Sequence, residues 1–181
     1  MFLLPARVTQ IAGRRRPASF LFFNRSESII VGITSSNLYL LRMQIGYSIL
    51  EHPSDLGIEA RGSSLIEAFQ NAATAMMSII LDLKTVTATE CRHITITATD
   101  EEQLLVKWLS EILYVYDGQR FVCSEFKITE FDRTHLEASI RGEMFLETKH
   151  RAKLDVKAVT YHQLSVKEND NGWIVRVFFD I

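Results

Sequence analysis

Cysteine is scarce in this chain of 181 residues, which contains only Cys91 and Cys123. The two show neither CxxC nor Cys/His spacing, so the sequence argues against a thiolate metal site and against a disulfide framework. Free cysteine is more often a small core residue than a nucleophile, and we assign neither residue a catalytic role. The pattern favours a reducing compartment, and we expect the protein in the cytoplasm.

Long apolar runs and the common nucleotide and hydrolase motifs are also absent. No run approaches the roughly 18 apolar residues of a membrane span. The eight glycines are scattered, without the GxxxxGK[ST] or GxGxxG spacing that cradles phosphates, and neither GxSxG nor HExxH occurs. The five histidines lie far apart in sequence and lack zinc spacing. With 47% hydrophobic content, the sequence predicts a soluble globular protein with one ordinary domain.

Acidic residues are nearly missing from residues 1–45, which carry six arginines and one glutamate and therefore a charge of +5. The remaining 14 bases and 21 acids give −7. An acidic body argues against direct binding of nucleic-acid phosphates by the main domain. Three interpretations of 1–45 stay open: a gene-model artefact with Met43 as the true start, a targeting presequence, or a poorly ordered arm that holds phosphate.

Residues 46–181 predict a single α+β domain, in which two helices pack on a mostly antiparallel β-sheet as a two-layer sandwich. Ser64 and Glu67 have the spacing of a capping box, and apolar residues at helical spacing extend from there to about residue 81. A second apolar stripe predicts a helix over 101–116, capped at its start by the acidic segment that begins with Asp100. Strands are predicted at 45–50, 58–61, the second half of 85–99, 121–131, 136–143, 154–160, 163–167 and 173–181.

The apolar run 173–181 ends in two adjacent carboxylates, the side chain of Asp180 and the terminal carboxylate of Ile181. Both are ionised at neutral pH unless they are buried without a partner. Adjacent negative charges require solvent, a cation or several N–H donors. One interpretation is a solvated tail; the other is a carboxylate site held by a rigid strand.

Asp55 lies in a polar bend that follows the first predicted strand, where a turn residue that binds its own backbone is one interpretation. If the first and last strands are neighbours, the carboxylates of Asp55, Asp180 and Ile181 converge. An all-oxygen set of this kind suits Ca²⁺ or Mg²⁺ better than zinc or copper. Lys157 and His162, in a polar cluster at 157–162, are then charge partners or proton donors; otherwise they belong to an exposed strand.

Two alternative functions follow from the same residues. The carboxylates would serve a small metal-dependent phosphoester hydrolase, with Lys157 as transition-state stabiliser and His162 as general acid. Few nucleophile or base candidates surround the acids, which disfavours this interpretation. In the other alternative the chain is a structural partner protein, and calcium only stabilises the carboxylate tip.

Several motifs resemble those of the archease family, in the family's order. They are EHPSDLGI at 51–58, SLIEAFQNAATAM at 64–76, WLSEILYVYD at 108–117, RGE at 141–143, KAVTYH at 157–162 and FDI at 179–181. The resemblance covers residues 45–181, with Pro53-Ser54 standing where the family usually has Thr-Ala. Residues 1–45 have no counterpart in it.

The resemblance implies a non-catalytic activator, or chaperone, of the RtcB-type RNA ligase that joins tRNA halves during tRNA splicing. Archeases promote guanylylation of the ligase's active-site histidine, support multiple turnover and widen its nucleotide use. The resemblance also implies a metal site formed by Asp55, Asp180 and Ile181, with Ca²⁺ as the ion. Candidate partner-contact residues are Glu51, His52, Lys157 and His162.

Overall fold

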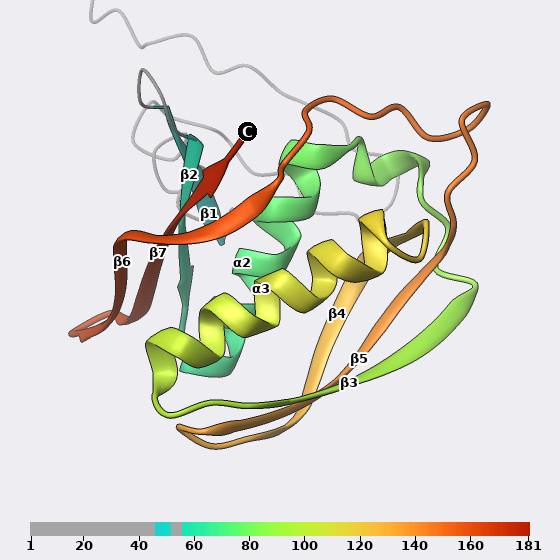
Figure 1. Cartoon of the computed structure of the whole chain (residues 1–181). Helices are drawn as coiled ribbons and strands as arrows, with labels where there is room; N and C mark the ends of the chain where they lie inside the picture. Colours follow the sequence, from blue (N-terminus) through green and yellow to red (C-terminus); the bar gives the residue numbers. More distant parts are fainter. Residues whose placement is uncertain (1–45, 52–55) are drawn as a thin grey trace, which may run out of the picture. The chain divides into compact units, whose positions relative to one another are not determined.

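The computed structural model describes residues 46–51 and 56–181 of the chain. The predictions made for residues 1–45, for His52 and for Asp55 lie outside this described part. Figure 1 shows the elements, which are β1 (Tyr47–Glu51), β2 (Leu56–Gly62), α2 (Leu65–Ile80), the short 3₁₀ turn η1 (Leu83–Thr85), β3 (Glu90–Thr97), α3 (Glu101–Asp117), β4 (Phe121–Phe131), β5 (His135–Met144), β6 (Ala158–Asn169) and β7 (Gly172–Asp180).

The strands form two antiparallel sheets. Sheet 1 has the order β1-β2-β7-β6, and sheet 2 has the order β3-β5-β4. The predicted α+β class is confirmed, although the strands divide between two sheets where one was expected. Alternation in a sequence shows that a segment is a strand but not which strand it pairs with. Here the connection 145–157 takes the chain from β5 in sheet 2 to β6 in sheet 1.

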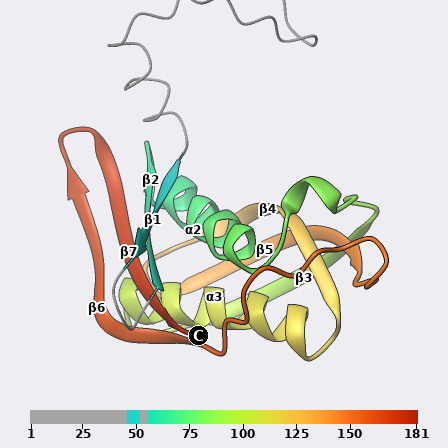
Figure 2. The same ribbon diagram turned by 90° about the horizontal axis from the view of Figure 1, so that it is seen from above.

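Helices α2 and α3 contact strands of both sheets, and the hydrophobic core lies between these layers. Figures 1 and 2 show both helices on the same side of sheet 2, beside sheet 1. The largest buried side chains include Trp108 and Phe69 from the helices and Phe121 and Phe179 from the strands. Trp108 Nε1–H donates to the Phe69 carbonyl over 3.2 Å, which satisfies the one polar atom of the buried indole.

Both helices begin at side-chain caps that the sequence predicts. The Ser64 hydroxyl accepts from the Glu67 amide over 3.2 Å, and the Asp100 carboxylate accepts from the Gln103 amide over 2.8 Å. The Glu67 carboxylate accepts from the amide of Ser63, one residue before the cap, where a capping box would use the Ser64 amide. No helix in residues 46–51 and 56–181 has the length and apolarity needed to cross a bilayer.

Replacing Ser64 by alanine is expected to lower the free energy of unfolding by about 1 kcal/mol, because it leaves an amide in the first turn of α2 without its acceptor. Urea denaturation monitored by circular dichroism measures this loss. Ser110 is an exposed serine inside α3, and alanine there should leave stability unchanged or slightly raised because alanine favours helix. Equal losses in both variants would contradict a capping role for Ser64.

One prediction about the strands is wrong. The segments 154–160 and 163–167 were expected as two strands, whereas the structure has the single strand β6, which starts at Ala158. Its pairing with β7 shifts between Thr160 and Ser165, because the four residues 161–164 of β6 lie opposite the single residue Val177 of β7. Gln163 takes a left-handed backbone conformation inside this bulge, with φ of 49°. The bulge interrupts the alternation that would otherwise have marked one continuous strand.

Candidate functional site

The carboxyl terminus leaves the end of an internal strand. β7 lies between β2 and β6 in sheet 1, so backbone hydrogen bonds hold it on both sides. Phe179 is fully buried, while Asp180 is exposed and Ile181 is 41% exposed. Figure 1 shows the chain end directly after the tip of β7, at one end of the strands of sheet 1. Two adjacent carboxylates are thus accessible to solvent directly after a residue that is fixed in the core.

Three segments that are distant in sequence meet at this strand end. Leu56, the first residue of β2, pairs with Phe179, and Ala158, the first residue of β6, pairs with Asp180. The amide of Lys157 donates to the Asp180 carbonyl over 2.8 Å. The backbone around Asp180 is therefore held from both neighbouring strands, which argues against the interpretation of a loose, solvated tail.

The structure describes only some of the predicted site residues. Lys157, Asp180 and Ile181 lie together at the end of sheet 1. His162 lies in the β6 bulge, with its ring centroid 5.7 Å from that of Phe178 and the two ring planes at 69°. Glu51 ends β1, where its backbone pairs with Leu56. His52 and Asp55 belong to the segment that is outside the described residues, so their placement stays a prediction.

The close approach of Phe178 explains why residue 57 of the 51–58 motif is a glycine. The two residues are paired across β2 and β7, and a Cβ atom on residue 57 would lie 2.9 Å from the Phe178 ring. Any side chain at position 57 would collide with this ring, so glycine is the residue that fits here. Phe178 in turn packs against His162, so the glycine, the phenyl ring and the imidazole form a layer beside the carboxylate end.

A charged network anchors the connection that leads into Lys157. Lys149 Nζ lies 2.6 and 2.7 Å from the two carboxylate oxygens of Glu143, and the Thr87 amide donates to the same carboxylate. These hydrogen bonds, from Lys149 first and from Thr87 next, lower the pKa of Glu143 to about 2. His150 is 2% exposed; its Nδ1 accepts from the Leu146 amide over 2.9 Å and its Nε2 lies 3.1 Å from Glu143 Oε1. The proton of the neutral ring is therefore on Nε2.

The rest of this connection is docked on the end of α2. Leu81 and Ala152 form an isolated antiparallel bridge, and the Lys153 amide donates to the Ile80 carbonyl over 2.7 Å. Together with the Glu143 network, these contacts fix both the start and the middle of the segment. Lys157 consequently reaches Asp180 from a held backbone rather than from a free loop.

Glu143 makes stability depend on acid pH. Because its pKa in the folded protein lies below the ordinary value of 4.5, its stabilising contribution is present above about pH 4.5 and is lost as the pH falls toward 2. Lys149 is partly exposed, so we expect only about 1–2 kcal/mol from the carboxylate. Glu143→Gln should remove this amount at pH 7 and little at pH 2.5. Urea denaturation at several pH values tests this; a constant difference between the two proteins would contradict it.

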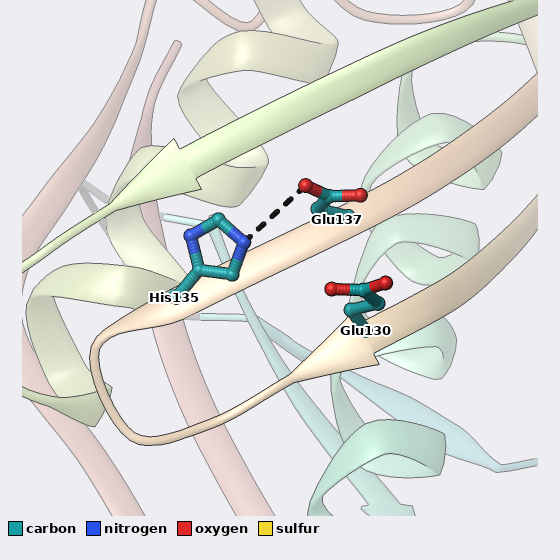
Figure 3. Close-up of side chains that lie close together, drawn as sticks. All are labelled: Glu130, His135 and Glu137. Carbon is teal, nitrogen blue, oxygen red and sulfur yellow. Dashed lines mark ion pairs between the residues drawn. The ribbon is translucent and has the colours of Figure 1, made fainter.

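A second group of side chains that could bind a metal was not predicted from the sequence. Glu130, His135 and Glu137 have ligand atoms that all lie within 4.8 Å of one another (Figure 3). Alternation alone places His135 and Glu137 on one face of a strand. Glu130 joins them only through the pairing of β4 with β5, which no local pattern reveals.

The donor set at the carboxyl terminus fits a hard cation. Asp180 and Ile181 offer only carboxylate oxygens, and both residues are exposed. Ca²⁺ and Mg²⁺ prefer oxygen ligands of this kind, and Ca²⁺ tolerates an irregular arrangement completed by carbonyls and water. The oxygen ligands and their exposure therefore fit a hard cation at this position.

Comparison with known proteins gives one consistent result. Residues 47–181 match the model of the Archease protein family (MTH1598/TM1083). The chain is 37% identical over 139 residues to "Protein archease" of Methanosarcina acetivorans, covering 75% of this chain and 95% of that protein. It is 40% identical over 136 residues to "Protein archease" of Saccharolobus islandicus strain M.14.25, covering 75% and 98%.

A solved structure extends the likeness to three dimensions. The solution structure of Methanobacterium thermoautotrophicum protein 1598 superposes with a TM-score of 0.66 and is 33% identical. The match covers 76% of this chain and 99% of that one. Family model, relatives and fold therefore agree, and the chain belongs to the archease family.

Proposed function

We propose that this chain is a non-catalytic activator of an RtcB-type RNA ligase in tRNA splicing and that it acts in the cytoplasm. It promotes guanylylation of the ligase and multiple turnover by presenting a carboxylate tip to the ligase's metal-bearing active site. The tip consists of Asp55, Asp180 and Ile181. Membership of the archease family supports the choice of partner, and the geometry of β7 supports the choice of surface.

The observation that carries the proposal is the position of Asp180, exposed and directly after the fully buried Phe179 on an internal strand. β7 cannot slide or fray without breaking backbone hydrogen bonds to both β2 and β6. The backbone that carries Asp180 is thus held before a partner arrives, which reduces the conformational entropy lost on binding. A rigid, acidic projection suits entry into an active site that carries metal ions.

Asp55, Asp180 and Ile181 are the residues that would hold Ca²⁺, with Mg²⁺ as the alternative hard ion. Support for Asp55 comes from its covalent neighbour, because Leu56 pairs with Phe179 just before the terminal carboxylates. A bound cation would offset the repulsion between carboxylates. The protein's own contribution would be to supply carboxylate oxygens from the end of β7 and from the residue that precedes β2 in the sequence.

The ligase contacts are proposed to surround this tip. Lys157 precedes β6 and is bonded through its amide to Asp180, and His162 packs on Phe178 two residues before Asp180. Both side chains are exposed and can donate to acidic or phosphate groups of a partner. Glu51, the last residue of β1, and His52, the next residue in the sequence, complete the proposed contact set.

A reconstituted ligation assay tests the proposed function. Purified RtcB-type ligase is supplied at a concentration well below that of the tRNA halves, with GTP, in the presence and absence of this chain. With the chain, we expect product in several-fold excess over ligase and accumulation of guanylylated ligase. Without it, product should stop near one equivalent of ligase.

The same preparation separates the alternatives. Hydrolysis of phosphoesters by the chain alone, abolished by a chelator, would support a metal-dependent hydrolase and contradict the activator proposal. If a chelator lowers the melting temperature of the chain, but chain freed of calcium and then of chelator still stimulates the ligase, calcium only stabilises the structure. Equal product with and without the chain would overturn the proposed partnership.

A further inference from the structure

The outer face of sheet 2 carries three metal-ligating side chains at the end of the β4–β5 hairpin. Glu130 on β4 pairs directly with Glu137 on β5, immediately after a shift in the pairing register. His135 lies two residues before Glu137 and therefore on the same face of β5. Figure 3 shows the imidazole and the two carboxylates gathered above the two strands.

The distances suit a single ion. The ligand atoms of Glu130, His135 and Glu137 all lie within 4.8 Å of one another, and His135 Nε2 is 3.5 Å from Glu137 Oε1. Ligands that bind a metal at about 2.0–2.2 Å are separated by less than twice that length, so small side-chain rotations would bring all three to one centre. Glu130 is exposed and the other two are half-buried, which leaves the centre open to solvent.

The charges at this position are unbalanced, unlike those elsewhere on the same face. Like charges directly opposite each other on paired strands are destabilising, yet within residues 46–51 and 56–181 neither Glu130 nor Glu137 forms a salt bridge with lysine or arginine. Farther along β5, by contrast, Arg141 is paired with Glu125 at 3.2 Å. A cation between Glu130 and Glu137 would remove the repulsion.

The hairpin turn holds His135 in place beside these carboxylates. The Asp132 carboxylate accepts from the amides of Thr134 and His135, each over 2.7 Å. The Ala98 amide donates to the Thr134 carbonyl over 2.7 Å, which ties the turn to the chain after β3. The backbone on both sides of the imidazole is thus bonded, so only side-chain rotation remains to be arrested when an ion binds.

We propose that Glu130, His135 and Glu137 form a site for a divalent transition-metal ion, with Zn²⁺ as the representative ion. An imidazole together with carboxylates favours Zn²⁺ over Ca²⁺, which prefers oxygen alone. Three protein ligands leave a coordination position for water or for a group from another molecule. This site is separate from the carboxylates at the end of β7, because it belongs to sheet 2 and they belong to sheet 1.

The test is a Zn²⁺ titration of the full chain in competition with a chromophoric chelator. Asp180→Asn serves as the parent, so that binding at the proposed site at the end of β7 is weakened. The parent should bind one equivalent of Zn²⁺. Adding His135→Gln or Glu137→Gln should weaken Zn²⁺ binding at least roughly tenfold. Loss of a residue that only hydrogen-bonds to a metal ligand already weakens binding by about tenfold or more, and loss of a ligand itself should cost at least as much.

His93 provides the matched control. It is an exposed histidine on β3 that pairs with Ser139, two residues after Glu137 on β5. His93→Gln in the same parent should change the Zn²⁺ affinity less than twofold. Glu130→Gln, at the most exposed of the three ligands, repeats the test with little risk to folding, which circular dichroism verifies. The proposal is overturned if the parent binds no Zn²⁺, if the ligand variants bind like the parent, or if His93→Gln is equally harmful.

Discussion

Asp180→Asn is expected to lower the Ca²⁺ affinity of the chain at least roughly tenfold and to abolish its stimulation of the ligase. The substitution removes one charge from the proposed tip and preserves the shape of the side chain. Because Phe179 and the backbone bonds of β7 are untouched, the fold should be retained. Isothermal titration with Ca²⁺ and the ligation assay measure the two effects.

Asp170→Asn is the matched control, because Asp170 is an exposed aspartate in the turn before β7, at the opposite end of the same strand. It should leave both readings unchanged. Extending the chain by two glycines beyond Ile181 should weaken both, because a peptide bond removes the terminal charge. Full stimulation of the ligase by Asp180→Asn and by the extended chain would rule out the carboxylate tip.

Gly142→Ala is expected to destabilise the protein by about 2–4 kcal/mol. A Cβ atom on this residue would lie 1.8 Å from the carbonyl oxygen of Val122, which belongs to the backbone of β4 and cannot rotate away. The central strand of sheet 2 would have to separate from its neighbour next to the bulge after Cys123. Thermal unfolding should show a clearly lower Tm, and urea denaturation should give the free-energy loss.

Ser139→Ala, on the same strand but on its outer face, provides the comparison. It should change the free energy of unfolding by no more than about 0.5 kcal/mol. A Gly142→Ala protein as stable as Ser139→Ala would show that β4 can shift at this point at negligible cost. The glycine in the 141–143 motif would then need another explanation than close contact between strands.

The helices were predictable because their signals are local. Ser64 and Asp100 cap the first turns through bonds to residues three positions ahead, and the apolar stripes that follow are visible at helical spacing. The division into two sheets was not predictable, because it depends on β7 pairing with β2 rather than with strands of sheet 2. Nothing in the alternation of 173–181 names its partner.

In the candidate site, too, local features were predictable and long-range contacts were not. The adjacent carboxylates of Asp180 and Ile181 are evident from the sequence. The position of Lys157 beside Asp180, by contrast, depends on long-range strand pairing. Glu130 and Glu137 show the limit more clearly, since only the register across the hairpin brings them together. The buried His150 is similar: its Nε2 meets Glu143 because the connection folds back on β5.

The internal position of β7 has a consequence for synthesis on the ribosome. β2 emerges early but must wait for β7, which is translated after every other described strand. Until then β2 and β6 each expose an unpaired edge, which is a template for wrong association. A nascent chain cut short before residue 172 would therefore lack the middle of sheet 1 and leave β2 and β6 each with an unpaired edge.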